Sequence, residues 1–255
     1  MEKAYKYRIY PNKKQQEIIS KTFGCCRFVY NKYLAKQIKM YEQNKETFSY
    51  VQCANDMKKL KSELEWLKEV DSTALQSSLR DLDMAYQKFF KEHSGYPKFK
   101  SKKTHKFSYK SKCVNGNIQY RDKYIKLPKL GMVKTKNKLI PQGRILNATI
   151  SQEPSGKYFV SLCCTEVDIE PFEKTNNTVG IDLGIKEFCI TSNGEMIPNP
   201  KYLKKSLEKL VKLQRELSRK SKGSSNRNKA RIKVARLHEH IANQRKDFYR
   251  NYLLK

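Results

Sequence analysis

The spacing of apolar residues changes twice along this chain, and each change limits the fold. Residues 4–10 alternate between apolar and polar side chains and end at a Pro-Asn pair, which indicates a β-strand. Three stretches with helical spacing follow, at about 13–45, 49–63 and 72–92. From 97 to about 166 the alternation returns, so we predict an α+β protein. The strands expected in that region are 106–110, 118–120, 124–127, 131–135, 145–152 and 157–165, separated by Asn-Gly, Pro and Ser-Gly turns.

The third helical stretch gives the clearest packing prediction. Either Asp71 or Ser72 is expected to cap its N-terminus, because both side chains can accept a hydrogen bond from the free N–H groups of the first turn. Apolar residues recur every three or four positions after that cap. They predict a buried stripe made of Leu75, Leu79, Leu82, Tyr86, Phe89 and Phe90.

The last third of the chain predicts a small β region followed by helices. Residues 167–177 are polar and are expected to form a linker. Strands are then expected at 179–182, 187–191 and 195–197, with Ser-Asn-Gly between the last two as a hairpin turn signal. The tail predicts two antiparallel helices with a basic outer surface, the second from about 227 to 248. One broad face of the first carries Leu203, Leu207, Leu210, Leu213 and Leu217.

The charge of the chain limits its partners. It has 54 Lys and Arg against 25 Asp and Glu, a net charge of +29. So large a positive field favours a polyanionic partner, and the alternative is a ribosomal-type or merely soluble basic protein. A membrane partner is not expected, because there is no apolar run of about 18 residues and no signal-peptide core. The sixteen Tyr and eleven Phe, spread among the cations, suit either base stacking or a core.

The cysteines predict a reducing compartment. There are seven, an odd number, and no two of them form a CxxC pair. A secreted disulfide scaffold and a structural zinc site are both disfavoured by that pattern. We therefore expect a cytoplasmic protein, associated with the bacterial nucleoid.

Asp182 is the residue most suggestive of chemistry. It lies in the short apolar sequence Val-Gly-Ile-Asp-Leu-Gly, in which one carboxylate on a strand is flanked by glycines. RNase H-like nucleases present their first metal ligand in this way, and a two-metal site needs several carboxylates. Glu195 could approach Asp182 from the hairpin, whereas the later acids lie in Lys-rich helical sequence. One carboxylate would hold Mg²⁺ poorly, so cleavage is not expected from this site alone.

Several separated motifs together resemble one family. The chain is similar to the insertion-sequence TnpB proteins, which are transposon-encoded RNA-guided DNA nucleases related to type V CRISPR effectors. The resemblance runs in order over nearly the whole chain. It is carried by Lys6–Pro11, Phe23–Asn31, Asp71–Gln76, Leu79–Leu82, Gly95–Lys100, Gly180–Ile185 and Leu237–Phe248.

The resemblance implies an architecture and two nucleic-acid partners. Residues 1–12 and 94–170 would form a wedge-type β-barrel, with residues 13–93 inserted as a helical recognition lobe. After a linker at 171–177, residues 178–255 would be a truncated RNase H-like (RuvC) domain. Family members hold a structured transposon-end RNA whose 3′ segment is the guide, and they recognise a short motif beside the double-stranded DNA target. Base pairing would then read the sequence while the protein holds the backbone.

The resemblance also implies roles for particular residues. Asp182 would be the vestigial catalytic residue and metal ligand. Thr73, Gln76 and Ser77 match the region that reads the target-adjacent motif, and Gln can pair with adenine in the major groove. The full set carried over to nucleic-acid binding is Lys6, Tyr7, Arg8, Arg27, Thr73, Gln76, Ser77, Arg80, Lys98, Lys100, Arg245 and Lys246.

The chain also departs from the family pattern. TnpB nucleases complete their site with a later Glu, a four-cysteine zinc ribbon and a final Asp, and this sequence stops before them. Three interpretations stay open: a nuclease-dead RNA-guided repressor, a fragment of an active endonuclease, and a decayed transposon product. Binding would need no cofactor, and Mg²⁺ would be needed only for cleavage. Strand 179–182 would be an open edge, covered by the helical tail, by RNA or by a second chain.

Overall fold

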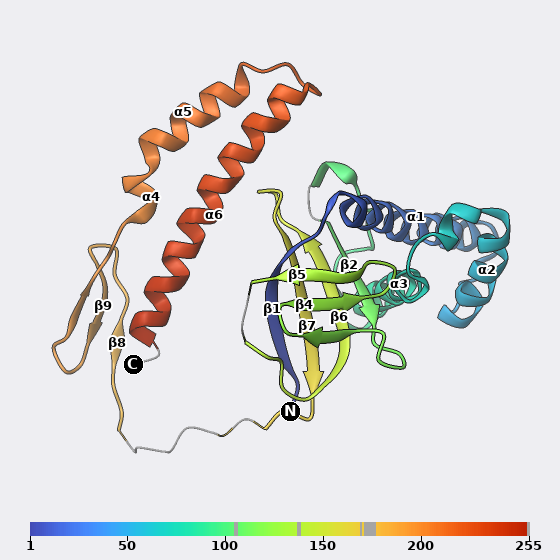
Figure 1. Ribbon diagram of the computed structural model, residues 1–255, viewed down its shortest axis with the longest axis horizontal. Coiled ribbons are helices and arrows are strands. Elements are labelled where there is room, and N and C mark those ends of the chain that lie inside the picture. The colour runs from blue at the N-terminus through green and yellow to red at the C-terminus, as the bar shows by residue number, and fades with distance from the viewer. Residues whose placement is uncertain (105–106, 137–138, 169, 171–176, 254–255) are drawn as a thin grey trace. The chain divides into compact units, whose positions relative to one another are not determined.

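The computed structural model divides into two units, residues 1–169 and residues 170–255 (Figure 1). It describes residues 1–104, 107–136, 139–168, 170 and 177–253. The linker expected at 171–177 lies almost entirely outside these residues. Both helices and antiparallel sheets are present, so the α+β prediction is confirmed. None of the helices in the described ranges is long and apolar enough to cross a membrane.

A seven-stranded antiparallel sheet organises the first unit, with the N-terminal strand β1 (Lys3–Tyr10) near its middle (Figure 1). Period-two alternation buries Tyr5, Tyr7 and Ile9 and leaves their neighbours facing out. The strand order is β2-β6-β7-β1-β5-β4-β3. The other strands are β2 (Phe107–Lys112), β3 (Gln119–Arg121), β4 (Tyr124–Leu127), β5 (Gly131–Thr135), β6 (Arg144–Gln152) and β7 (Tyr158–Thr165), each within two residues of its predicted bounds.

Three helices lie between β1 and β2 in the sequence, and α1 and α3 pack against β2. α1 (Lys13–Asn44) starts with a capping box in which Asn12 and Gln15 each bond the other's backbone N–H. α2 (Tyr50–Glu63) has the same arrangement of Ser49 and Gln52. α3 spans Ser72–Glu92 and is capped by Asp71, one of the two residues predicted for that role. Short 3₁₀ turns occupy Glu65–Lys68 and Lys102–Thr104.

The predicted stripe of α3 is only partly correct. Leu75, Leu79 and Leu82 are buried, but Phe90 is 64% exposed. Tyr86 is partly buried against the core, and Tyr86 and Phe89 each pack edge to face on Tyr96, at 5.8 and 5.3 Å between centroids. Phe90 is stacked on Tyr86 at the outside of that cluster. The apolar residues of α3 therefore keep their helical spacing past the end of the core, and the last of them is not buried in it.

The second unit pairs a three-stranded antiparallel sheet with helices. β8 (Ile181–Asp182), β9 (Glu187–Thr191) and β10 (Met196–Pro198) follow the order β10-β9-β8. β8 is shorter than the predicted 179–182, because the Gly180 carbonyl still accepts from the Ser192 N–H but the Gly180 N–H bonds the Ser192 hydroxyl in place of a backbone carbonyl. Among the described residues β8 pairs only with β9, so the expected open edge is present there. What covers that edge stays a prediction.

The helical tail contains one more break than expected. α4 (Tyr202–Lys205) and α5 (Leu207–Ser218) are separated by Ser206, whose φ of −101° and ψ of 0° leave the helical region. The predicted leucine face is therefore discontinuous, and Leu203 and Leu207 are 41% and 49% exposed. α6 (Ser225–Leu253) packs antiparallel to α5 through a small core. That core consists of Leu210, Leu237 and Ile241, with Tyr202, Leu213 and Val234 around it.

Candidate nucleic-acid interface

Asp182 presents its carboxylate at an exposed strand edge. Its register partner is Ile190 of β9. The backbone next to it is held by Ser192, whose hydroxyl accepts from the Gly180 N–H at 3.0 Å and whose N–H donates to the Gly180 carbonyl at 2.9 Å. Within the described ranges, no group of three or more His, Cys, Asp or Glu side chains could hold a metal ion. Because a two-metal site needs several such ligands, the role of Asp182 in holding a metal ion stays a prediction.

The three residues predicted on β1 separate into one core residue and two surface cations. Tyr7 is 1% exposed, and burial raises the pKa of its phenol, so the prediction that it contacts nucleic acid is wrong. Its inward direction follows from the strand period, which places Lys6 and Arg8 on the outer face. Lys6 pairs with Glu153 at 3.3 Å and lies over the Phe159 ring. Arg8 lies over the Tyr10 ring, with 4.8 Å to its centroid.

The polar residues at the start of α3 mostly face inward. Thr73 donates its hydroxyl to Asp71 at 2.7 Å and lies 3.1 Å from the Ser111 hydroxyl of β2. Ser77 is 3% exposed and donates to the Thr73 carbonyl at 2.8 Å. These hydroxyls join the helix to itself and to the sheet, so the buried Ser77 does not offer its hydroxyl to DNA, whereas a DNA contact of the partly buried Thr73 stays a prediction. Gln76 is exposed, and its contact with DNA stays a prediction.

Arg80 lies one turn further along the exposed side of α3. Its guanidinium carbon lies 4.9 Å from the centre of the Tyr50 ring, and its Nε donates to the Tyr50 hydroxyl at 3.3 Å. The ring restrains the direction of the side chain, and no carboxylate among the described residues forms an ion pair with it. Gln76 and Arg80 therefore form one exposed polar row at i and i+4 on the helix.

The segment after α3 brings two predicted motifs together. Asn31 of α1 accepts from the Lys100 N–H at 2.8 Å and donates its side-chain amide to the Lys100 carbonyl at 2.9 Å. The Lys100 ammonium lies 4.1 Å from the Tyr30 ring centre and 3.7 Å from Asp81. Lys98, two residues earlier, is exposed, and Arg27 is half-buried on α1. Neither pairing could be derived from the sequence, because the two motifs lie 69 positions apart.

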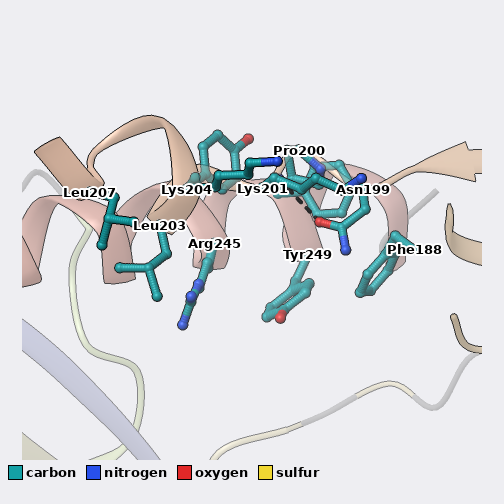
Figure 2. Close-up of a pocket in the computed structure, with 11 residues that line it drawn as sticks. Phe188, Asn199, Pro200, Lys201, Leu203, Lys204, Leu207, Arg245 and Tyr249 are labelled. Atoms are coloured by element: carbon teal, nitrogen blue, oxygen red, sulfur yellow. Dashed lines mark hydrogen bonds between the residues drawn. The ribbon is translucent and has the colours of Figure 1, made fainter. Parts of the chain in front are cut away.

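A pocket of about 510 Å³ in the second unit contains one of the predicted cations (Figure 2). Arg245 of α6 lines it, whereas Lys246 is exposed on the same helix outside the lining. Figure 2 shows Leu203, Arg245, Tyr249 and Phe188 in a row, with their side chains extending to the same side. The rings of Phe188 and Tyr249 are 5.5 Å apart and tilted by 31°. Sequence reasoning missed both rings, although the helical spacing of Arg245 and Tyr249 at i and i+4 was a usable signal.

Comparisons with known proteins place these features in context. The family model OrfB_IS605, described as a probable transposase, matches residues 161–253, and the model HTH_OrfB_IS605, described as a helix-turn-helix domain, matches residues 1–46. In this structure residues 1–46 contain β1 and the single helix α1. The two matched regions lie near opposite ends of the chain.

Two relatives match nearly all of the chain. A protein described as a candidate RNA-guided DNA endonuclease from Streptomyces pristinaespiralis is 38% identical over 97% of this chain and 62% of its own length. InsQ of Escherichia coli strain K12, described in the same terms, is 33% identical over 96% of this chain and 61% of its own. The chain thus spans about three fifths of these relatives. A solved CRISPR-Cas12f ternary complex is 13% identical, with a TM-score of 0.40, over 94% of this chain and 60% of that one.

Proposed function

The chain belongs to the TnpB family, and on that premise we propose that it is an RNA-guided DNA-binding protein. It holds a transposon-derived guide RNA and targets double-stranded DNA beside a short motif. The observation that carries the proposal is the charge excess of +29. If every carboxylate in the chain took one cation, 29 positive charges would still have no partner within it. A guide RNA and a DNA target supply the phosphates that such a surface binds.

The proposal divides the work between base pairing and protein. Guide and target strand pair with each other, and the protein holds their backbones without reading them. In this proposal the β1–β7 sheet acts as the wedge-type domain, the helices at 13–92 act as the recognition lobe, and residues 178–255 act as a RuvC-like domain. Gln76 and Arg80 face the target-adjacent duplex, where Gln can bond adenine and Arg can bond guanine. Their exposure on one side of α3 supports this role.

We further propose that the described residues bind the target without cutting it. Asp182 contributes one carboxylate on a two-residue strand. Mg²⁺ keeps several waters and needs near-octahedral oxygen ligands, which this carboxylate does not supply by itself. A protein that stays bound to its target blocks transcription through it, so the biological output is repression. Binding itself needs no metal ion.

The second candidate is an RNA-guided endonuclease, favoured by the descriptions of the two relatives. In that case Asp182 would be one ligand of a metal site completed by residues outside the described set, and Mg²⁺ would be required. The two candidates share guide and target and differ only in whether a DNA strand is broken.

One purification separates the candidates. RNA that co-purifies with the full chain is sequenced, and its 3′ segment is used to design a matched DNA duplex and a scrambled duplex. Guide-dependent gel shift without strand breakage in Mg²⁺ supports the binding protein. Breakage of the matched duplex that is lost in Asp182→Ala supports the endonuclease. The absence of any bound RNA would refute both, and so would bound RNA with equal affinity for matched and scrambled DNA and no strand breakage.

A further inference from the structure

The pocket between α4, β9 and α6 carries the groups needed to hold a nucleotide. Three cations line it, Lys201, Lys204 and Arg245, and none of the described residues that line it carries a carboxylate. None of these three side chains makes an ion pair or side-chain hydrogen bond with another residue in the described ranges. A pocket of about 510 Å³ also falls within the range of small-molecule sites.

The aromatic residues supply a stacking surface beside those cations. Phe248 is half-buried and packs edge to face on Phe188, with 5.1 Å between the ring centroids. Tyr249, next to Phe248 in the sequence, is the more exposed of these two pocket rings at 42% accessible. Tyr249 lies one helical turn after Arg245, so a base on the tyrosine ring would set its phosphate near the guanidinium. Both side chains extend to the same side in Figure 2.

The backbone around the pocket is fixed by bonds that do not use the ligand-facing groups. Asn199 donates its amide to the Ile185 carbonyl at 3.0 Å and accepts from the Lys201 N–H at 3.1 Å. Lys201 adopts a left-handed φ of 48°, which turns the chain into α4 and directs Leu203 and Lys204 to the pocket. The wall is therefore formed before a ligand arrives, which lowers the entropic cost of binding.

We propose that this pocket binds one unpaired nucleotide of the guide RNA, with its base stacked on Tyr249 and its phosphate held by Arg245 and Lys204. The base must be unpaired, because a paired base does not offer its face to a protein ring. The inference rests on the proposed function, since RNA is the partner that the protein carries before it meets any DNA. The charge of the lining fits a phosphate and disfavours an acyl chain or a neutral peptide.

The test measures binding of a fluorescein-labelled 12-nucleotide poly(A) RNA to the full chain by anisotropy. Loss of one base–aromatic stack on alanine substitution lowers affinity by about 5- to 150-fold. Tyr249→Ala should therefore weaken RNA binding by that factor. Tyr249→Phe keeps the ring and should weaken it by less than about twofold. Tyr124→Ala is the control, because Tyr124 is also 42% exposed and does not line the pocket, whereas Tyr252 packs on the lining ring of Phe248 at 4.7 Å.

The phosphate contact has its own control. Arg245→Gln should reduce the slope of log affinity against log salt by about 0.7, the value for one phosphate of a single strand. Arg250→Gln removes the same charge from the same helix outside the pocket and should change the affinity less. Equal effects of the two substitutions on RNA affinity and its salt dependence would mean that Arg245 acts only as part of a diffuse basic surface, and would refute the proposal.

A measurement on the unmodified protein covers the case in which a variant unfolds. Ultraviolet cross-linking of the RNA complex followed by trypsin digestion should place the modified nucleotide on the peptide 247–250 or on 187–201, which carry Tyr249 and Phe188. Cross-links confined to other peptides would overturn the assignment. Tighter binding of a DNA oligonucleotide with the same length and base sequence than of the RNA would also overturn it. If the wild-type chain binds no RNA at all, the proposed function fails, whereas RNA binding that is insensitive to Tyr249→Ala refutes only the pocket.

Discussion

Replacing Asp71 should destabilise the first unit more than any surface change on the same helix. Its carboxylate is 7% exposed and accepts from the Thr73 N–H at 3.1 Å, from the Thr73 hydroxyl at 2.7 Å and from the Ser111 hydroxyl. Asp71→Ala removes the helix cap, worth about 1 kcal/mol, and leaves the fully buried Ser111 hydroxyl short of an acceptor, worth about 1–3 kcal/mol. The free energy of unfolding should therefore fall by about 2–4 kcal/mol.

The assay can follow that unit alone. Trp66 is the only tryptophan in the chain, and it packs edge to face on Phe28 at 5.0 Å within the first unit. Thermal unfolding followed by tryptophan fluorescence therefore does not report on the second unit. For a unit of this size, about 2–4 kcal/mol corresponds to a fall in Tm of about 5–15 °C. Asp71→Asn keeps an acceptor for the cap and should lose about half as much.

Asp81→Ala is the matched control. Asp81 is on the same helix, but its side chain is 46% exposed and its ion pair with Lys100 spans 3.7 Å, so its loss should cost less than about 1 kcal/mol. A Tm for Asp71→Ala within about 2 °C of the wild type would refute the reasoning. So would Asp71→Asn proving as harmful as Asp71→Ala, because the cap would then contribute nothing.

Three further outcomes are expected. Gln76→Ala should weaken the binding of matched DNA in a gel shift without changing Tm. Ser77→Ala should lower Tm and leave the DNA affinity unchanged. The reverse pattern would show that Ser77 contacts DNA. Burial alone would raise the pKa of Asp56, but hydrogen bonds led by that from Lys36 outweigh it and hold that pKa below its ordinary value. The ionised Asp56 thus contributes to the free energy of unfolding above about pH 4, and this contribution is lost as pH falls through the lowered pKa. The difference in Tm between the wild type and Asp56→Asn should therefore shrink from pH 6 to pH 3. Burial raises the pKa of the Cys25 thiol to about 11, so iodoacetamide at pH 8 should label it only after unfolding, as peptide mass spectrometry can check.

The element boundaries could be predicted because local chemistry determines them. Asn12 and Gln15 form a reciprocal capping box that is readable in four residues, and α1 starts where it requires. The alternation in residues 4–10 assigns each side chain of β1 to one face of the sheet. Neither signal needs a contact partner from elsewhere in the chain.

The direction of small polar residues could not be predicted, because it depends on a neighbouring helix. Ser78 is buried and donates to the Cys26 carbonyl of α1 at 2.7 Å, and Ser77 bonds within its own helix. In sequence, such hydroxyls are typical of a solvent face. In the fold Ser78 fills the contact between α1 and α3, where a larger side chain would separate the helices. The recognition motif and the packing motif occupy the same stretch of sequence, and of the three polar residues predicted to read DNA only Gln76 is exposed.

The predicted cations also differ in whether contacts within the fold already hold them, and this difference affects how each can bind RNA. Lys100 lies 3.7 Å from Asp81, and the Asn31 side chain fastens its backbone, whereas Lys98 is exposed and has no ion pair with a described residue. A phosphate that binds Lys100 must displace Asp81, which costs little because an exposed ion pair is worth about 0–1 kcal/mol. The freed carboxylate then takes up a cation from solution and offsets part of the counterion release that drives binding. Lys98 should therefore contribute more than Lys100 to the salt dependence of RNA affinity, although the two residues are equivalent in the sequence motif.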